Sequence, residues 1–166
     1  MLPLLFVCNV DEASAATGNA LSRRVEAMAS GLGARTVTVA AGIEAELAGL
    51  DDAERAEYLQ SLGLAEPGLN RVIAEGYALL GLLTYFTVGP KEARAWTVRR
   101  GSTAPEAAGV IHTDFQKGFI CAETIAYDDY VACNGEVGAK EAGKMRLEGR
   151  DYVVREGDVM HFRFNV

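Results

Sequence analysis

The sequence predicts an α/β unit followed by a smaller α+β unit in which one helix packs on a mixed sheet. In the first half of the chain, two apolar or β-branched runs, Leu4–Val7 and Arg35–Ala41, alternate with amphipathic helical stretches. In the second half, short strand-like runs flank a helical stretch that ends near Gly109. The composition of the 166 residues, 49% hydrophobic and 23% charged, is that of a globular protein with a packed core.

The first expected strand is Leu4–Val7, a continuous apolar run typical of a strand that is buried on both faces. Its polar end, Asn9–Glu12, lies where α/β sheets bind ligands, just past the carboxyl end of a parallel strand. A helix over Gly18–Leu32 follows. The expected inward stripe of this helix is Leu21, Val25, Met28 and Ala29. A strand so near the first residue, with no partner strand nearby, suggests that the chain has been cut from a longer one.

A second parallel strand over Arg35–Ala41 and three helical segments complete the first unit. The helical segments are Gly42–Leu50, Ala53–Leu62, capped by Asp51 or Asp52, and Gly68–Leu80, preceded by Pro67. The inward stripe of the last helix is expected to be Leu69, Val72, Ile73, Tyr77 and Leu80. This β-α-β-α-α order is about half of a doubly wound domain. We place the boundary at Gly81–Thr84, which gives units of residues 1–83 and 84–166.

The second unit is expected to hold one helix, Pro105–Gly109, with Ser102 or Thr103 as its cap, and a polar corner at His112–Asp114. Residues 137–144 are interpreted as one helical turn or a loop. The expected strands are Tyr85–Thr87, Ala93–Val98, Phe119–Tyr127, Met145–Leu147, Tyr152–Val154 and Val159–Val166.

Charge and cysteine content limit the possible partners. The net charge of −7 is uneven: residues 1–83 hold 5 Lys/Arg and 11 Asp/Glu, and residues 84–166 hold 11 and 12. The second unit is therefore the better candidate for binding a polyanion. The apolar run Met1–Val10 is too short to span a membrane and lacks the features of a signal peptide, so no membrane partner is expected. Cys8, Cys121 and Cys133 lack metal-type spacing and are interpreted as buried thiols, with a reactive thiol as the alternative.

The segment from Thr84 to Val166 contains TYFT, EARAWTV, GSTAPEAAGVIHTDFQKGFI, AYDD, GAKEAGKMRLEG and GDVMHFRFNV. It resembles the C-terminal TGS-type domain of the YchF/Obg-like ATPase family, and residues 1–83 resemble the tail of that family's nucleotide-binding domain. The resemblance implies a partial P-loop NTPase α/β domain followed by a β-grasp (ubiquitin-like) TGS domain. It also implies a cytoplasmic parent protein that binds ATP or GTP with Mg²⁺ and associates with ribosomes or RNA.

Within this resemblance, Asn9-x-x-Glu12 takes the place of the Asn-Lys-x-Asp element of P-loop GTPases. That Asn pins a neighbouring loop and contacts the base, and the carboxylate accepts from two guanine donors. The longer Glu displaces the carboxylate, so the resemblance implies Asn9, Val10 and Glu12 as base contacts and a preference for ATP. The alternative is that Asn9 and Glu12 only end a strand and cap a helix.

Ala40-Ala41-Gly42 takes the place of a Ser-Ala-Lys element, and because its Ser and Lys are absent, only a backbone contact from Ala41 is implied. The sequence has no G-x-x-x-x-G-K-[ST] loop and no downstream Asp for Mg²⁺. Phosphoryl transfer depends on such groups, so this chain alone is expected neither to hydrolyse ATP nor to bind it tightly. The missing segment of the parent is expected to hold the Mg²⁺.

The two histidines are interpreted as capping or core-edge groups rather than catalysts. His112 lies near Asp114 and Lys117, and His161 lies inside an expected strand. The same interpretation applies to Asp128–Asp129, and no set of side chains has metal-ligand spacing. The candidate polyanion contacts are Lys91, Arg94, Arg99, Arg100, Lys140, Lys144, Arg146 and Arg150. We expect the first four to bind RNA or the ribosome, with a merely solvated face as the alternative.

Two functions stay open. The chain is either the C-terminal fragment of a YchF-type ATPase that supplies base recognition and an adaptor domain, or a standalone RNA- or ribosome-binding module without nucleotide function. In either case the free edge of the Leu4–Val7 strand is expected to promote self-association.

Overall fold

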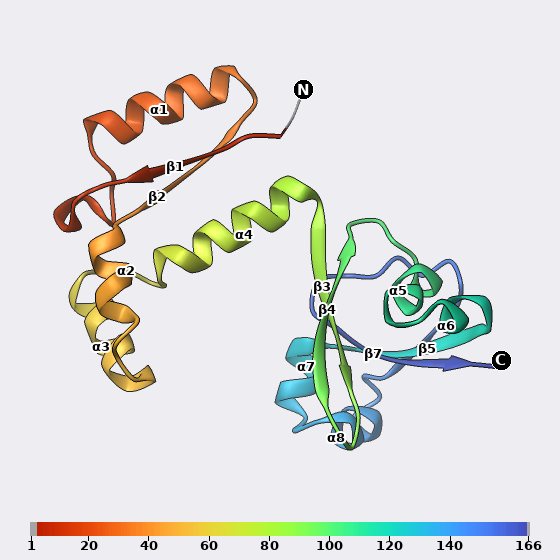
Figure 1. The fold of residues 1–166 in the computed structure, drawn as a ribbon. Helices are drawn as coiled ribbons and strands as arrows, with labels where there is room; N and C mark the ends of the chain where they lie inside the picture. The colour runs from red at the N-terminus through yellow and green to blue at the C-terminus, as the bar shows by residue number, and fades with distance from the viewer. Residues whose placement is uncertain (1–2, 166) are drawn as a thin grey trace. The chain divides into compact units, whose positions relative to one another are not determined.

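The computed structural model describes residues 3–165 and divides into two compact units, one ending at Leu80 and one beginning at Gly81 (Figure 1). The division falls at the end of a helix, slightly before the boundary expected after residue 83. The elements of the first unit are β1 (Leu5–Asn9), the 3-10 turn η1 (Glu12–Ser14), α1 (Ala20–Gly31), β2 (Arg35–Val39), α2 (Ala41–Leu47), α3 (Asp52–Ser61) and α4 (Gly68–Leu80).

The first unit is built on β1 and β2, which run parallel with a register from Leu5↔Arg35 to Asn9↔Val39. Helices α1 and α4 lie on opposite sides of this strand pair (Figure 1). The α2–α3 segment packs around a separate small core below the carboxyl ends of the strands. The buried residues of that core are Ala15, Ala40, Ile43, Leu47 and Leu59.

Local capping explains where these helices begin. Asn19 Oδ1 accepts from the N–H groups of Leu21 and Ser22, which fixes the start of α1. Asp51 caps α3 in the same way and forms a reciprocal capping box with Glu54, which confirms one of the two predicted caps. Gly33 and Gly63 follow α1 and α3 with positive φ, the conformation that ends a helix at low cost for glycine.

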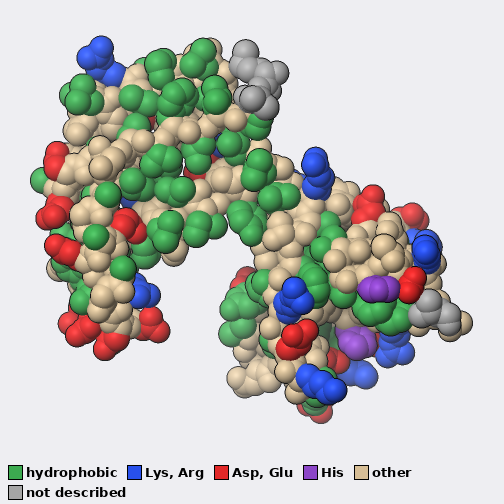
Figure 2. Space-filling model, in the orientation of Figure 1, with side chains coloured by type: hydrophobic (Ala, Val, Ile, Leu, Met, Phe, Trp, Pro, Cys, Tyr) green, Lys and Arg blue, Asp and Glu red, His purple; other side chains and the backbone are tan. Residues whose placement is uncertain are grey.

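The burial predicted for the first unit is partly wrong. Leu4 and Val7 are 46% and 51% exposed, so β1 is not buried on both faces. Of the stripe predicted for α1, only Ala29 is fully buried, while Leu21 is 68% exposed. The predicted stripe residues Met28, Leu69, Ile73 and Leu80 are exposed as well. A sheet of two strands is too narrow to cover the whole apolar face of either flanking helix. Figure 2 shows hydrophobic side chains gathered over this part of the unit.

The second unit is a five-stranded mixed sheet of order β4-β3-β7-β5-β6, in which β3 and β7 are parallel and the other pairs are antiparallel. Its strands are β3 (Leu82–Val88), β4 (Ala93–Arg99), β5 (Phe119–Ala126), β6 (Arg146–Glu148) and β7 (Asp158–Phe164). Its helices are α5 (Ala104–Ile111), α6 (Thr113–Lys117), α7 (Tyr127–Ala132) and α8 (Glu136–Glu141). This mixed sheet and its helices confirm the α+β character expected for the second half.

Helix α5 covers one face of this sheet and supplies the centre of its core. Ala104, Ala107 and Ala108 of α5 are fully buried, and the hydroxyl of buried Tyr85 donates to the Ala107 carbonyl at 2.8 Å. The predicted Thr103 cap is confirmed, because Thr103 and Glu106 form a capping box. The sheet residues of this core are Leu83, Tyr85, Val98, Phe119, Ala122, Met160 and Phe162.

Three predictions for the second unit are wrong. Residues 152–154 do not form a strand; Val153 makes a single isolated bridge to Thr103. The expected polar corner after His112 is a short helix, α6, whose first turn is capped by the His112 side chain. Tyr127, expected at a strand end, instead begins α7. Asn134 and Gly135 form a turn between α7 and α8 with positive φ values of 54° and 110°.

A buried polar cluster replaces the missing strand. The carboxylate of Asp158 accepts from the Tyr152 hydroxyl at 2.8 Å and from the Arg155 N–H at 2.9 Å. Arg146 donates to the same hydroxyl at 3.0 Å. Burial, and next the hydrogen bond to Asp158, raise the pKa of Tyr152 to about 12. These bonds hold the 150–155 segment and β6 against β7.

Candidate functional site

The candidate site consists of two corners that follow β1 and β2. Because the strands are parallel and adjacent, with Asn9 in register with Val39, their carboxyl ends place both corners at the same edge of the sheet. The backbone ladder continues into the corners, since Val10 N–H donates to Val39 O at 2.9 Å. The predicted residues Asn9, Val10, Glu12 and Ala41 therefore lie together.

Asn9 joins the two corners directly. Its Oδ1 accepts from the Ala41 N–H at 2.9 Å, a contact between residues 32 positions apart. Ala41 is the first residue of α2, and the Ala40 cap provides no side-chain hydrogen bond of its own. Asn9 thus satisfies one of the unpaired donors at the start of this helix. This hydrogen bond matches the loop-pinning role that the family resemblance implied for Asn9.

Glu12 is the second side chain of the β1 corner that lies against the start of α2. It begins η1, whose cap is Asp11, with Asp11 Oδ1 accepting from Ser14 N–H at 3.0 Å. A Cβ atom placed on Gly42 would lie 3.3 Å from Glu12 Oε1, so the carboxylate lies against the Gly42 backbone. Among residues 3–165, the Glu12 carboxylate has no hydrogen bond or ion pair, and its two oxygens stay available as acceptors.

The Ala41 amide has a different role from the one expected. We expected its N–H to contact a base, but this donor is already bonded to Asn9. Glu44 N–H bonds to Ala40 O, so the next orphan donors of α2 are the N–H groups of Gly42 and Ile43. Of these two residues, Gly42 is the one against which the Glu12 carboxylate lies, and the sequence alone did not single it out.

Glu44 is a structural residue of the site that the sequence analysis missed. Its two carboxylate oxygens accept from Gly68 N–H at 2.7 Å and from Leu69 N–H at 3.2 Å, so α2 caps the start of α4. A Cβ on Gly68 would lie 2.8 Å from Glu44 Oε1 and 3.0 Å from Val39 Cγ1, so a side chain there would displace the Glu44 carboxylate. The sequence offered little sign of this contact, because Glu44 and Gly68 are 24 residues apart.

The four cations predicted to bind a polyanion all lie on the hairpin of β3 and β4. Lys91, Arg94, Arg99 and Arg100 are exposed, and the Arg94 guanidinium stacks 4.1 Å from the centre of the Trp96 ring. Arg94 and Arg99 lie on opposite faces of β4 because five positions separate them. The structure therefore brings these residues to one hairpin but not to one face.

Three of the other candidate cations are engaged within the second unit. Lys144 pairs with Asp129 at 3.1 Å, and Arg146 pairs with Glu148 at 2.8 Å. Arg150 donates to the Phe119 carbonyl at 3.0 Å. These contacts make the three residues structural. Within residues 3–165, the fourth member of the set, Lys140, is exposed and has no ion pair.

The remaining predictions concern metals, thiols and membranes. In the part of the chain that the structure describes, no group of His, Cys, Asp and Glu side chains could hold a metal ion. Cys8, Cys121 and Cys133 are free and partly exposed, not fully buried as expected. His112 caps α6 as predicted, and His161 is exposed on β7. No helix within residues 3–165 is long and apolar enough to cross a bilayer.

Comparison with known proteins identifies the family. A family profile described as "YchF-GTPase_C: Protein of unknown function (DUF933)" matches residues 82–165. The "Ribosome-binding ATPase YchF" proteins of Haemophilus influenzae and Bacillus subtilis are 62% and 52% identical over 164 and 166 residues. The chain belongs to the YchF family. Each alignment covers 99% of this chain and 45% of the relative, so the chain spans less than half the length of these YchF proteins.

Solved structures agree with this assignment. The YchF GTPase of Schizosaccharomyces pombe matches with a TM-score of 0.80 and 32% identity, over 97% of this chain and 43% of that one. A GTP-binding protein of Pyrococcus horikoshii matches with a TM-score of 0.66 at 18% identity, which supports the fold alone. The mixed α/β architecture is thus similar to that of YchF GTPase structures.

Proposed function

We propose that this chain is the C-terminal part of a cytoplasmic, ribosome-associated YchF ATPase. The unit ending at Leu80 would complete a P-loop-type nucleotide domain, and the unit from Gly81 on would be a TGS-type β-grasp adaptor. The names of the relatives, ribosome-binding ATPase and GTPase, support the activity of the parent. The mixed sheet that holds α5 against one face supports the β-grasp assignment.

The observation that carries the nucleotide proposal is the joining of the two corners by the Asn9–Ala41 hydrogen bond. At the position where guanine has a carbonyl acceptor, adenine has an amine donor. A free Ala41 N–H would suit the guanine carbonyl, but this donor is used by Asn9. The Glu12 carboxylate can accept from an amine of either base, so the preference rests on the absence of a donor for the guanine carbonyl. The corner therefore favours adenine, with Val10 packing along the base.

The phosphates and Mg²⁺ of such a nucleotide would be held by residues outside this sequence, because the sequence contains no P-loop. Base contacts alone give weak binding, so ATP or GTP would bind tightly only in the intact parent. We expect no ATP hydrolysis by the purified chain, as measured by phosphate release. Sustained turnover by this chain would contradict the proposal.

A second candidate function is a standalone RNA- or ribosome-binding module. The observation in its favour is the β3–β4 hairpin, on which four exposed cations gather without any contribution from the first unit. Binding of this hairpin to the ribosome is part of both proposals; only nucleotide binding at the corners separates them.

Cosedimentation with ribosomes tests the hairpin. We expect the wild-type chain to pellet with ribosomes, and a variant with Lys91, Arg94, Arg99 and Arg100 each changed to Glu to remain in the supernatant. A variant with Arg23, Arg24, Lys117 and Lys140 changed to Glu has the same net charge and serves as the matched control. Equal pelleting of both variants would remove the hairpin from the proposal.

Self-association through β1 is also proposed. Among the described residues, β1 pairs only with β2, so its other edge presents unpaired backbone groups. Sedimentation velocity over a concentration series tests this, and a chain that stays monomeric at high concentration would contradict it.

A further inference from the structure

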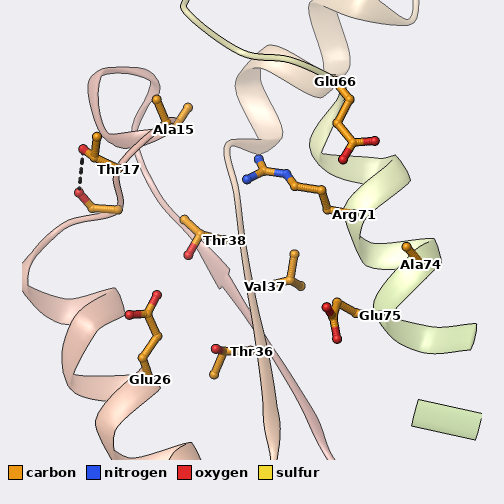
Figure 3. Close-up of a pocket in the computed structure, with 12 residues that line it drawn as sticks. Ala15, Thr17, Glu26, Thr36, Val37, Thr38, Glu66, Arg71, Ala74 and Glu75 are labelled. Atoms are coloured by element: carbon orange, nitrogen blue, oxygen red, sulfur yellow. Dashed lines mark hydrogen bonds between the residues drawn. The ribbon is translucent and has the colours of Figure 1, made fainter. Parts of the chain in front are cut away.

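The second edge of the same strand pair, that of β2, opens into a hollow of about 420 Å³ (Figure 3). Helix α1 borders the hollow on one side and α4 on the other, and the Ala15–Gly18 loop closes one end. This surface belongs neither to the two corners that follow β1 and β2 (the base corners) nor to the β3–β4 hairpin with its four cations (the cationic hairpin). The hollow therefore needs an explanation of its own.

The backbone hydrogen bonds show which residues face the hollow. Arg35 N–H donates to Leu4 O at 3.1 Å, and Val10 N–H donates to Val39 O at 2.9 Å. In a parallel pair these bonds alternate, so Arg35, Val37 and Val39 direct their backbone groups toward β1. The N–H and C=O groups of Thr36 and Thr38 consequently point away from β1, to the free edge.

The side chains of β2 divide between the two borders of the hollow. Figure 3 shows Thr36 and Thr38 on the α1 side of the strand and Val37 on the α4 side. A strand added at this edge would alternate its own side chains in the same way, with one set toward α1 and the other toward α4. The hollow thus has the geometry of a slot for one more strand.

An unsatisfied donor lies at this slot. Arg71 of α4 extends its side chain toward β2, and its Nε is buried without a hydrogen-bond partner (Figure 3). Within residues 3–165, no hydrogen bond or ion pair of the Arg71 guanidinium is found either. A buried donor of this kind costs free energy unless an acceptor reaches it, and the carbonyl of an added strand is such an acceptor.

The charge of the slot identifies the occupant. Glu26 lies on the α1 side, and Glu66 and Glu75 lie on the α4 side (Figure 3). Within residues 3–165, Glu75 pairs with Arg35 at 2.7 Å, and Glu26 and Glu66 have no ion pair. These two unpaired carboxylates outnumber the one guanidinium in the slot, that of Arg71. The net charge of −6 on residues 1–83, from 5 Lys/Arg and 11 Asp/Glu, repels the phosphates of a nucleic acid. Pairing with a second copy of this edge is also unfavourable, because the carboxylates of the two copies would repel each other.

We propose that the β2 edge binds an extended, Lys- or Arg-rich polypeptide segment of a partner protein by strand addition. The backbone of the segment pairs with Thr36 and Thr38, and one of its carbonyls accepts from Arg71 Nε. Its basic side chains reach Glu26 on one side and Glu66 on the other. The proposal is independent of nucleotide binding and of the cationic hairpin.

A twelve-residue, fluorescein-labelled peptide that repeats Lys-Lys-Thr-Thr serves as the probe, because paired lysines place basic side chains on both faces of an added strand. Its binding to the full 166-residue chain is measured by fluorescence anisotropy at near-physiological salt. We expect Thr38→Pro to weaken binding by about tenfold or more, because proline removes an outward N–H and blocks pairing. Thr38→Val keeps the N–H and is expected to bind as the wild type does.

Thr38→Pro leaves the β1–β2 hydrogen bonds intact, since Thr38 does not donate to β1, so an unchanged melting temperature is expected. Amide hydrogen exchange gives a second readout: the peptide should slow exchange at Thr36 and Thr38 and leave it unchanged at the free edge of β1. Wild-type affinity for the probe in folded Thr36→Pro and Thr38→Pro variants would overturn the proposal. Equal binding of a glutamate–threonine peptide, displacement of the probe by an RNA oligonucleotide, or a dimer that Thr38→Pro abolishes would also overturn it.

Discussion

At the residue scale, the candidate base site depends on a few side chains that connect segments distant in sequence. Asn9 connects the β1 corner to α2, and Glu44 connects α2 to α4. Both work by satisfying N–H groups at helix starts, where the helix itself provides no acceptor. Removing either acceptor would loosen the corner before any ligand is considered.

Asn9→Ala tests this connection in the absence of nucleotide. The variant loses the acceptor for the Ala41 N–H, and we expect the free energy of unfolding to fall by about 0.5–1.5 kcal/mol, measured by urea denaturation. Asn9→Asp retains an oxygen at this position and should retain most of the stability. A loss of equal size in both variants would contradict the assigned role of Oδ1.

Tyr152 provides a pH-dependent test in the second unit. Its hydroxyl donates to buried Asp158, so Tyr152→Phe should cost about 1–3 kcal/mol at neutral pH. Because its pKa is raised to about 12 in the folded chain, above the value near 10 of an unfolded tyrosine, the neutral hydroxyl stabilises the fold fully below pH 10. That stabilisation is lost as the pH rises through 12.

The difference in unfolding free energy between the wild type and Tyr152→Phe should therefore shrink between pH 10 and pH 12. Burial raises the pKa of Tyr85 too, so both proteins lose stability in alkali and only their difference reports on Tyr152. A difference that stays constant from pH 8 to pH 12 would show that the hydroxyl is not the stabilising group.

At the element scale, close backbone contacts fix the ends of the second sheet. Asn165 N–H donates to Gly118 O at 2.9 Å, just before β5 begins. A Cβ atom on Gly118 would lie 1.9 Å from Asn165 O, which is backbone and cannot move aside cheaply. Glycine is thus required where α6 passes into β5.

Gly118→Ala is expected to destabilise the chain by roughly 1–3 kcal/mol, the cost of overpacking a tight contact. Thermal unfolding followed by circular dichroism measures the change. Gly149→Ala is the control, because its added Cβ would meet nothing within 4 Å, and its melting temperature should stay near that of the wild type. Equal melting temperatures for the two variants would refute the close contact at Gly118.

The elements that sequence patterns predicted well are those with long apolar periodicity or a clear cap. Helix α4 begins and ends as expected, and Thr103 caps α5. The short helices α6 and α7 were missed for two reasons. Polar or strand-like residues precede their starts at Thr113 and Tyr127, and each helix is too short to show a helical period. Periodicity also marks an apolar face without showing what covers it, which is why Leu21 was wrongly expected to be buried.

The candidate site was likewise predictable only in part. Adjacency of Asn9 and Ala41 was predictable, because parallel strands end at one edge and the family resemblance aligned both corners. That the Ala41 amide is bonded to Asn9 was not predictable, since a single hydrogen bond leaves no trace in sequence spacing. The hollow beside β2 was likewise absent from the sequence analysis, because it arises from three elements that pack around one strand edge.

At the scale of the whole molecule, the two units divide the proposed work. The first is strongly acidic and holds the base corners and the β2 slot, and the second is nearly neutral and holds the cationic hairpin. Acidic side chains gather over α3 in the first unit (Figure 2). The proposed contacts with an adenine base, a basic peptide and a polyanion therefore fall on separate surfaces and can be tested independently.

The measurement that tests the base site most directly is the ¹H–¹⁵N spectrum of this chain during titration with ATP and, separately, with GTP at millimolar concentrations. We expect weak shifts confined to the amides of Val10, Glu12, Ala41 and Gly42, with larger shifts for ATP than for GTP. Equal or larger shifts with GTP, shifts located elsewhere in the chain, or no shifts with ATP would contradict the assignment of these corners as an adenine site.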